Sequence, residues 1–162
     1  MNPRHVNHTF PAVIDSECRT LILGSVPSVK SIEQGFYYMH PQNRFWKVLS
    51  NLFHIDFLTM SIDERKTALL ARHIALYDSV EECDIMGSAD SKIEGVIPAD
   101  IGKLIKESKI TRIFCNGKAS YKYFAKYNPE YLHFVSILPS TSPANASYSL
   151  DRLIEEWKVI LC

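Results

Sequence analysis

The sequence predicts an α/β fold, a three-layer α/β/α domain built around a central four-stranded parallel sheet. Two observations support this prediction. Segments with helical spacing alternate with short apolar runs, and such alternation implies right-handed crossovers between parallel strands. The runs end in polar or turn residues, as expected of strands buried on both faces. They are RTLILG (19–24), HIALYDSV (73–80), RIFCNG (112–117) and HFVSILPS (133–140).

The first two predicted helices follow the first strand. Apolar residues recur at helical spacing in one segment: Phe45, Trp46, Leu49, Leu52 and Phe53. The next helix begins at SIDERKTALLARH, where Ser61 and Glu64 have the spacing of a capping box. Both segments therefore predict helices that lie between the first and second strands.

Three more helices are predicted in the second half of the chain. Pro98 is expected in the first turn of a helix that carries Ile101, Leu104 and Ile105. Residues 117–127 and 150–161 form the other two, and the last has an apolar stripe typical of a helix packed on a sheet. We find no internal repeat or linker, so residues 1–162 are predicted to form a single domain.

Composition and charge exclude several classes of protein. The 18 basic and 18 acidic residues cancel, which argues against a protein that coats nucleic acid through its overall charge. No apolar run approaches the roughly 18 residues of a membrane span, and the N-terminus lacks a secretory signal. The four cysteines are scattered without a C-x-x-C motif, so neither a zinc site nor an iron–sulfur cluster is expected. We therefore expect a cytoplasmic protein that holds no metal.

Polar and turn residues collect where the four predicted strands end. Because ligands bind beyond the carboxyl ends of parallel strands, these residues are expected to line a site. Each group alone is also compatible with an ordinary turn, and their coincidence at one edge favours a site. The residues are Gly24, Ser25, Pro27 and Ser28 after the first strand, Asp78 and Ser79 after the second, Asn116 to Lys118 after the third, and Ser140, Thr141, Ser142, Pro143 and Asn145 after the fourth.

Several chemistries are not supported at this edge. The sequence has no G-x-S-x-G elbow, no phosphate-binding P-loop and no G-x-G-x-x-G turn. Only one acid, Asp78, is obvious there, whereas sugar hydrolysis by paired carboxylates needs two. The remaining interpretation is a polar, aromatic pocket whose amides and hydroxyls hold phosphate oxygens and whose rings stack on a planar ligand.

Five segments, taken in order, resemble the uracil-DNA glycosylase superfamily, and most closely its hypoxanthine (deoxyinosine) DNA glycosylase branch. They are GSVPS, YYMHPQNRFW, ALYDSVEECDIMGSADSKI, FCNGKAS and LPSTSPANA, and the resemblance extends from about residue 10 to residue 162. It implies the uracil-DNA glycosylase fold and removal of a deaminated base from DNA. It also implies that no cofactor is needed.

The resemblance also implies roles for particular residues. Superfamily members carry an acid or amide in the first motif, where this sequence has Val26, so the water-positioning role passes to Asn43 in the downstream loop. The alternative for Asn43 is a turn residue that caps the following helix. Leu138 replaces the His or Asn of the second motif and cannot hydrogen-bond a departing base.

The other expected contacts follow from the same resemblance. Asp78 is expected to accept a hydrogen bond from an N–H of the base, and hypoxanthine presents such a group at N1. Tyr38 or Phe45 would stack on the flipped ring. His40 would assist electrostatically, or serve only as a turn residue before Pro41. Ser25, Ser28, Ser140 and Ser142 would hold the flanking phosphates, with local positive charge from Lys30, Arg44, Lys47 and Lys118.

The expected partner is DNA that contains a deaminated base, bound by a monomer. Two alternatives stay open at this point. One keeps the enzyme class and changes the preferred base to uracil or xanthine. The other is a nucleic-acid-binding domain without catalytic activity, which the apolar Val26 and Leu138 would suit.

Overall fold

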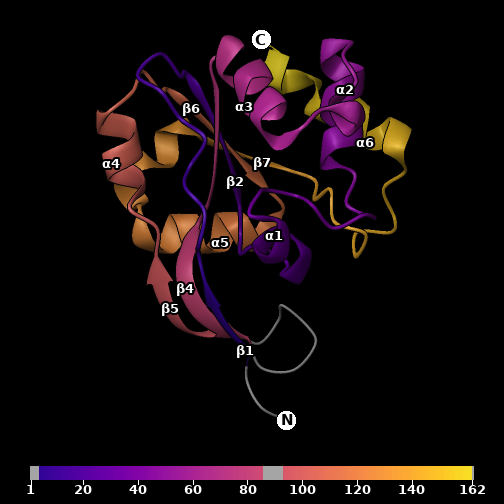
Figure 1. The fold of residues 1–162 in the computed structure, drawn as a ribbon. Helices are drawn as coiled ribbons and strands as arrows, with labels where there is room; N and C mark the ends of the chain where they lie inside the picture. The colour runs from indigo at the N-terminus through magenta and orange to yellow at the C-terminus, as the bar shows by residue number, and fades with distance from the viewer. Residues whose placement is uncertain (1–3, 86–92, 162) are drawn as a thin grey trace.

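The four predicted strands form one parallel sheet in the computed structural model, which describes residues 4–85 and 93–161 (Figure 1). The strand order is β3-β2-β6-β7. The strands are β2 (Thr20–Gly24), β3 (Ile74–Asp78), β6 (Arg112–Asn116) and β7 (Val135–Leu138). Part of the ALYDSVEECDIMGSADSKI segment, residues 86–92, lies outside the described residues, as does Cys162. The predicted four-stranded parallel sheet is confirmed.

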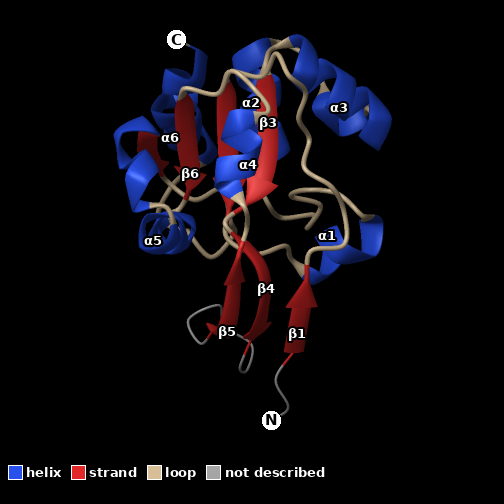
Figure 2. Cartoon of the chain, turned by 90° about the vertical axis from the view of Figure 1, so that its left-hand side faces the viewer, coloured by secondary structure: helices blue, strands red, loops and turns tan. Residues whose placement is uncertain are grey.

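Helices cover both faces of this sheet (Figure 2). Side chains alternate along β2, so that Ile22 packs into a core with α2 and α6, while Leu21 and Leu23 pack into a second core with α4 and α5. The helices are α2 (Phe45–Phe53), α3 (Ile62–Ala71) and α6 (Leu150–Trp157) on one face, and α4 (Ile101–Lys106) and α5 (Lys118–Tyr127) on the other. This arrangement is the predicted three-layer fold.

A second, antiparallel sheet that we did not predict lies below the first in Figure 1. Its order is β1-β4-β5, from β1 (Arg4–Asn7), β4 (Val80–Ile85) and β5 (Ile93–Pro98). Only Ser79 separates β3 from β4, so the apolar run 73–80 passes directly from one sheet into the other. Ser79 is fixed at this junction, because its N–H donates to Gly24 O at 2.8 Å and its hydroxyl to Ser120 O at 2.9 Å.

The pattern of the second sheet explains why it was missed. The pairing of β4 with β5 shifts register twice, so the buried residues Val80, Cys83 and Ile85 do not alternate regularly. Gly95 in β5 has a φ of +60°, which suits glycine. Pro98 ends β5 and does not lie in the first turn of α4, whose N-cap is Asp100. The prediction for Pro98 was therefore wrong.

The helix ends follow the expected chemistry. Ser61 and Glu64 form the predicted capping box, with the Glu64 N–H at 3.1 Å from Ser61 Oγ and the Ser61 N–H at 3.0 Å from Glu64 Oε1. A short helix that we did not predict, α1 (Val29–Gln34), interrupts the long aromatic loop and ends at Gly35, where φ is +71°. The described residues also form three 3₁₀ helices: η1 (Phe57–Thr59), η2 (Pro129–Phe134) and η3 (Lys158–Leu161).

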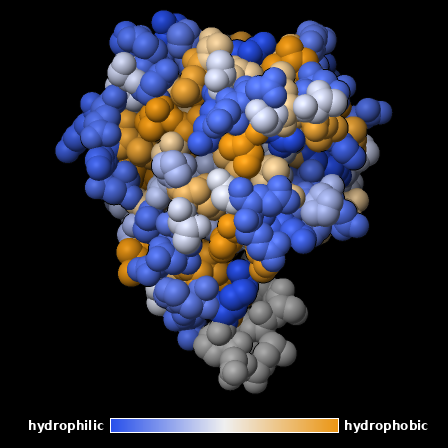
Figure 3. Space-filling model, in the orientation of Figure 1, coloured by the Kyte–Doolittle hydropathy of each residue, from blue (hydrophilic) through white to orange (hydrophobic). Residues whose placement is uncertain are grey.

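The surface mixes polar and apolar residues. Figure 3 shows hydrophilic side chains over much of one face, with smaller apolar patches between them. None of the helices in the described part of the chain has the length and apolar character required to cross a membrane.

Candidate functional site

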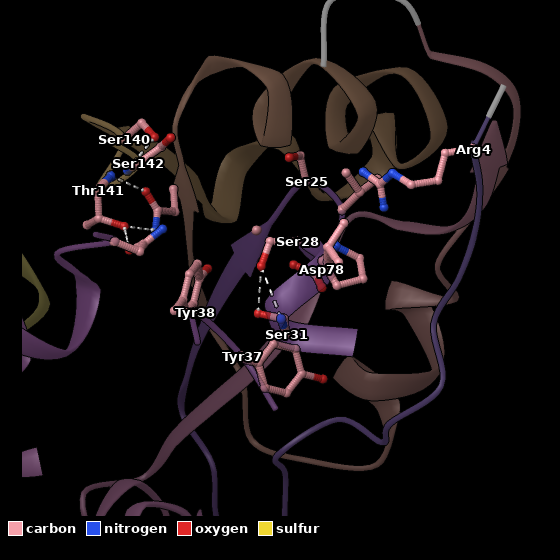
Figure 4. A pocket seen from close by; sticks show the side chains of 16 residues that line it. Arg4, Ser25, Ser28, Ser31, Tyr37, Tyr38, Asp78, Ser140, Thr141 and Ser142 are labelled. Carbon is pink, nitrogen blue, oxygen red and sulfur yellow. Dashed lines mark hydrogen bonds between the residues drawn. The ribbon is translucent and has the colours of Figure 1, made fainter. Parts of the chain in front are cut away.

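A cavity of about 220 Å³ lies at the edge where the parallel strands end (Figure 4). Gly24 ends β2, Asp78 ends β3 and Asn116 ends β6, and all three line the cavity. The predicted place of the site therefore coincides with a cavity. Its volume is below the 300–1,000 Å³ typical of sites for drug-sized ligands, so it suits a single small ring system.

Ten of the fourteen residues that we expected in catalysis or in substrate contacts line this cavity, and so does Asn116, which we predicted at the same edge. The ten are Gly24, Ser25, Pro27, Ser28, Tyr38, Asn43, Asp78, Ser140, Thr141 and Ser142. The other four, His40, Phe45, Pro143 and Asn145, are not part of its lining. The His40 ring accepts a hydrogen bond from the Gln42 N–H at 3.1 Å, which suits the turn role. Asn145 donates to Ser140 O at 3.0 Å and lines a neighbouring groove.

Asn43 is held by a chain of hydrogen bonds whose directions are determined. Its Oδ1 accepts from the Phe45 N–H at 3.0 Å and from the Thr141 hydroxyl at 2.8 Å. The Thr141 hydroxyl accepts from Asn116 Nδ2 at 2.9 Å, and the Thr141 N–H donates to Asn116 Oδ1 at 3.0 Å. Since backbone N–H groups only donate, both amide side chains have a single orientation. The Asn43 Nδ2 group is thus left to contact a ligand.

Arg44 connects the loop that carries Asn43 to residues 140–148 through hydrogen bonds. Its backbone N–H donates to Thr141 O at 3.0 Å. Its guanidinium donates to Ser142 O and Asn145 O, each at 3.1 Å, and to Tyr148 O. The predicted role of Arg44 was local positive charge, and the structure shows that its donors are engaged with main-chain carbonyl groups. These contacts set the distance between Asn43 and the segment after β7.

The two rings expected to stack on a base are stacked on each other. The Tyr38 and Phe45 centroids lie 4.0 Å apart with 20° between the planes, and Phe45 is fully buried. Tyr38 has a φ of +57°, a left-handed backbone conformation that is uncommon for a tyrosine. Tyr38 therefore covers Phe45, and only Tyr38 contacts the cavity.

The serines of the site use their oxygens within their own loops. Ser28 is the N-cap of α1 and accepts from the Ser31 N–H at 3.1 Å. Ser140 Oγ accepts from the Ser142 N–H at 3.1 Å, and Ser142 Oγ accepts from the Ala144 N–H at 3.2 Å. Each of these last two bonds uses a lone pair, so the hydroxyl hydrogens of Ser140 and Ser142 remain available to an anionic oxygen.

Several residues of the cavity lining were not predicted from the sequence. Arg4, Val29, Ser31 and Tyr37 also line the cavity. Arg4 comes from β1, in the unpredicted sheet, and its side chain extends towards the cavity in Figure 4. His8, directly after β1, is not part of the lining but contacts Asp78 Oδ2 through its Nε2. The only signal in the sequence was the polar and apolar alternation of RHVNH, which is too short to identify a strand reliably.

The two motif positions that depart from the superfamily pattern have structural roles. Leu138 is 5% exposed and belongs to the main core, so it does not reach the cavity. Val26 lines the cavity and also packs against the core between the small sheet and α5. Both side chains therefore anchor loops of the site by apolar packing.

Burial determines the protonation of the tyrosines around the cavity. Burial, and to a smaller extent the charge of Asp78, raises the pKa of Tyr37 and Tyr38 well above the usual range. Both hydroxyls are therefore neutral. Tyr37 donates to Pro11 O at 2.9 Å, whereas the buried Tyr38 hydroxyl has no hydrogen-bond partner of normal geometry among the described residues. Tyr38 thus offers an unused donor next to the cavity.

Comparison with known proteins identifies relatives of this chain. The family model described as "Uracil DNA glycosylase superfamily" matches residues 11–160. A hypoxanthine DNA glycosylase of Methanosarcina acetivorans is 31% identical, over 96% of this chain and 98% of its own length. A protein of the same name from Methanosarcina barkeri is 38% identical over 52% of this chain and 54% of its own.

A solved structure shows the same architecture. It is the solution NMR structure of a candidate uracil DNA glycosylase from Methanosarcina acetivorans. It superposes with a TM-score of 0.83 at 30% identity, and covers 97% of this chain and 96% of that one.

Proposed function

The chain belongs to the uracil DNA glycosylase superfamily, and we propose that it hydrolyses the N-glycosidic bond of deoxyinosine in DNA and releases hypoxanthine. The names of its two relatives support the choice of base. The observation that carries the proposal is the Asn43 amide, which is oriented in a small cavity with its Nδ2 group unpaired by other described residues.

The target base must leave the base stack of the DNA duplex to reach this cavity. A base inside the stack is inaccessible, and extruding it costs a few kcal/mol, less for a mispaired base. Ser140 and Ser142 retain hydroxyl hydrogens for the phosphates on either side, and Arg4 adds a positive charge at the edge of the cavity. These contacts hold the backbone without reading its sequence.

The chemical step follows from what an amide can and cannot do. The bond between C1′ and N9 breaks, its electron pair leaves with the base, and a water oxygen forms the new bond to C1′. Asn43 Nδ2 donates a hydrogen bond to one lone pair of the water oxygen, and the other lone pair of that oxygen is directed at C1′. Because an amide does not accept a proton, base departure must lead, so that water attacks an oxocarbenium-like sugar and loses its proton to solvent.

The test is base release from labelled duplexes that contain one inosine, uracil, xanthine or ethenocytosine, followed by alkali. We expect the inosine strand to be cut. Asn43→Ala should lower the rate roughly 100-fold, the cost of losing one well-placed donor. Asn51→Ala is the matched control, because Asn51 is an exposed residue of α2 whose amide contacts only Lys47 O among the described residues.

Three outcomes would contradict the proposal in different ways. Cutting of the uracil or xanthine strand in preference to inosine would change the base and keep the enzyme class. Strands that bind but stay resistant to alkali would indicate a binding domain without catalytic activity. A folded Asn43→Ala protein with the rate of the wild type would remove Asn43 from the mechanism.

A further inference from the structure

A buried histidine, His8, contacts Asp78, a polar residue of the cavity lining. The His8 side chain is fully buried, between the rings of Phe10 and Tyr77, whose centroids are each 4.5 Å from its own. Its Nδ1 lies 2.8 Å from Phe10 O, and its Nε2 lies 2.8 Å from Asp78 Oδ2. Both ring nitrogens therefore have a partner, and one partner is a residue of the cavity.

The partners determine how many protons the pair holds. A carbonyl oxygen only accepts, so the contact with Phe10 O requires a proton on Nδ1 of His8. The contact of Nε2 with a carboxylate oxygen requires a second proton between these two atoms. This proton lies either on the ring, which makes an imidazolium beside an ionised carboxylate, or on Oδ2, which leaves both groups neutral. In both arrangements the pair carries no net charge.

The other oxygen of Asp78 is left for a ligand. Oδ1 makes no hydrogen bond with the described residues, and Asp78 is part of the cavity lining. Its position depends on Gly24, where an added Cβ would lie 2.3 Å from Oδ1 and 3.1 Å from the Tyr38 hydroxyl. Glycine at the end of β2 therefore leaves room for a carboxylate oxygen next to an unpaired phenol.

We propose that His8 is a positioning residue for base selection, which keeps Asp78 ionised so that Oδ1 accepts a hydrogen bond from a ring N–H of the flipped base. The inference rests on the proposed function and extends it to the feature of the base that is read. Hypoxanthine carries a hydrogen at N1, whereas adenine has a lone pair there. A carboxylate attracts the first and repels the second.

The same chemistry selects a class of bases. Deamination of adenine or cytosine replaces a ring nitrogen that accepts by one that donates, since uracil likewise carries a hydrogen at N3. Sites built to pair with a donor reject analogues that lack it, because their own buried group stays unpaired. The His8–Asp78 pair therefore discriminates hypoxanthine from adenine and uracil from cytosine, whereas guanine and xanthine both carry a hydrogen at N1 and are not distinguished in this way.

The first test measures the pair in the wild-type protein without DNA. Two-bond ¹H–¹⁵N correlation spectra at neutral pH distinguish a ring with two protonated nitrogens from a neutral ring. The His8 signals are assigned by their absence in His8→Phe or in a second variant, His8→Gln. We expect both His8 nitrogens to carry protons. A bare Nε2 would place the proton on Asp78 and overturn the inference, whatever the enzyme releases.

The second test measures selection directly. In the Asn43→Ala background, in which base release is expected to be slow, we compare the Kd for duplexes with inosine or adenine at one position. His8→Phe should reduce the preference for inosine roughly tenfold, the effect of one hydrogen bond to a charged group. His5→Phe is the control, because His5 lies in β1, shortly before His8 in the sequence, with its side chain exposed and paired with Asp84.

A conservative variant separates selection from folding. In Asp78→Asn, a neutral His8 accepts from the new amide N–H, which leaves the amide oxygen facing the cavity. This variant should keep most of the preference for inosine, whereas Asp78→Leu should lose it. Equal weakening of both duplexes by His8→Phe and by Asp78→Asn would show a merely structural role and overturn the inference. Failure of the wild type to release hypoxanthine would instead overturn the proposed function.

Discussion

Gly24→Ala is the most direct test of how closely the strand ends approach one another. The backbone of Gly24 is not in the left-handed region, so alanine itself is allowed there. The obstacle is the Asp78 carboxylate, since the new Cβ would lie 2.3 Å from Oδ1. Reaching 3.0 Å needs a shift of 0.7 Å, the difference between 3.0 and 2.3, and an ordinary 3.4 Å contact needs 1.1 Å.

Asp78 lines the cavity, and a shift of its carboxylate would stretch its hydrogen bond with His8. Its Oδ2 is bonded to His8 at 2.8 Å, and both side chains are buried, at 5% and 0% exposed. Overpacking costs about 1–3 kcal/mol, and stretching a buried charged hydrogen bond adds to it. We therefore expect Gly24→Ala to lower the free energy of unfolding by at least about 2 kcal/mol in urea melts.

A double-mutant cycle shows whether Asp78 is the cause. In the Asp78→Ala background the contact with Oδ1 is absent and only the 3.1 Å approach to the Tyr38 hydroxyl remains, so Gly24→Ala should then cost less than half as much as in the wild type. Gly102→Ala is the control, because it lies in α4 and its nearest neighbour, the Tyr131 hydroxyl, would be 3.4 Å away. Additive costs of the two substitutions, or a Gly24→Ala protein as stable as the wild type, would refute the reasoning.

Two further predictions concern buried groups. Thr141→Val removes the hydroxyl that joins Asn116 to Asn43, so the free energy of unfolding should fall by about 1–3 kcal/mol and base release should slow. Thr67→Val, on the exposed face of α3, is the control. Equal losses of stability in the two variants would contradict this prediction. Burial raises the pKa of Cys18 and Cys115 to about 11, so few thiolates exist at pH 8 and iodoacetamide should label both only after unfolding. Rapid labelling of either residue in the native protein would refute this.

The central sheet could be predicted because each of its strands carries its own local signal. β2, β3 and β6 are buried almost throughout and read as continuous apolar runs. The carboxyl ends of these strands then place Gly24, Asp78 and Asn116 at one edge, without knowledge of the order of the strands. That is why most of the cavity lining could be predicted from the sequence.

The small sheet could not be predicted, because its signal is spread over distant segments. β1 pairs with β4 across a separation of more than 70 residues, and β4 pairs irregularly with β5. Arg4 lines the cavity and His8 contacts Asp78 only because β1 adds to this sheet, so neither could be assigned to the site beforehand. Phe45 was misjudged for a similar reason, since its cover by Tyr38 depends on the left-handed backbone at residue 38.

Asn43 was open to two interpretations, as a turn residue before α2 or as the catalytic amide, and the geometry makes them compatible. Its Oδ1 accepts the Phe45 N–H at the beginning of the helix, as a turn residue would. The same bond, with that from Thr141, fixes which end of the amide faces the cavity. An unconstrained asparagine could present either end to water, and only the N–H₂ end can donate. The local structural role is therefore what orients the group for the catalytic role that we propose.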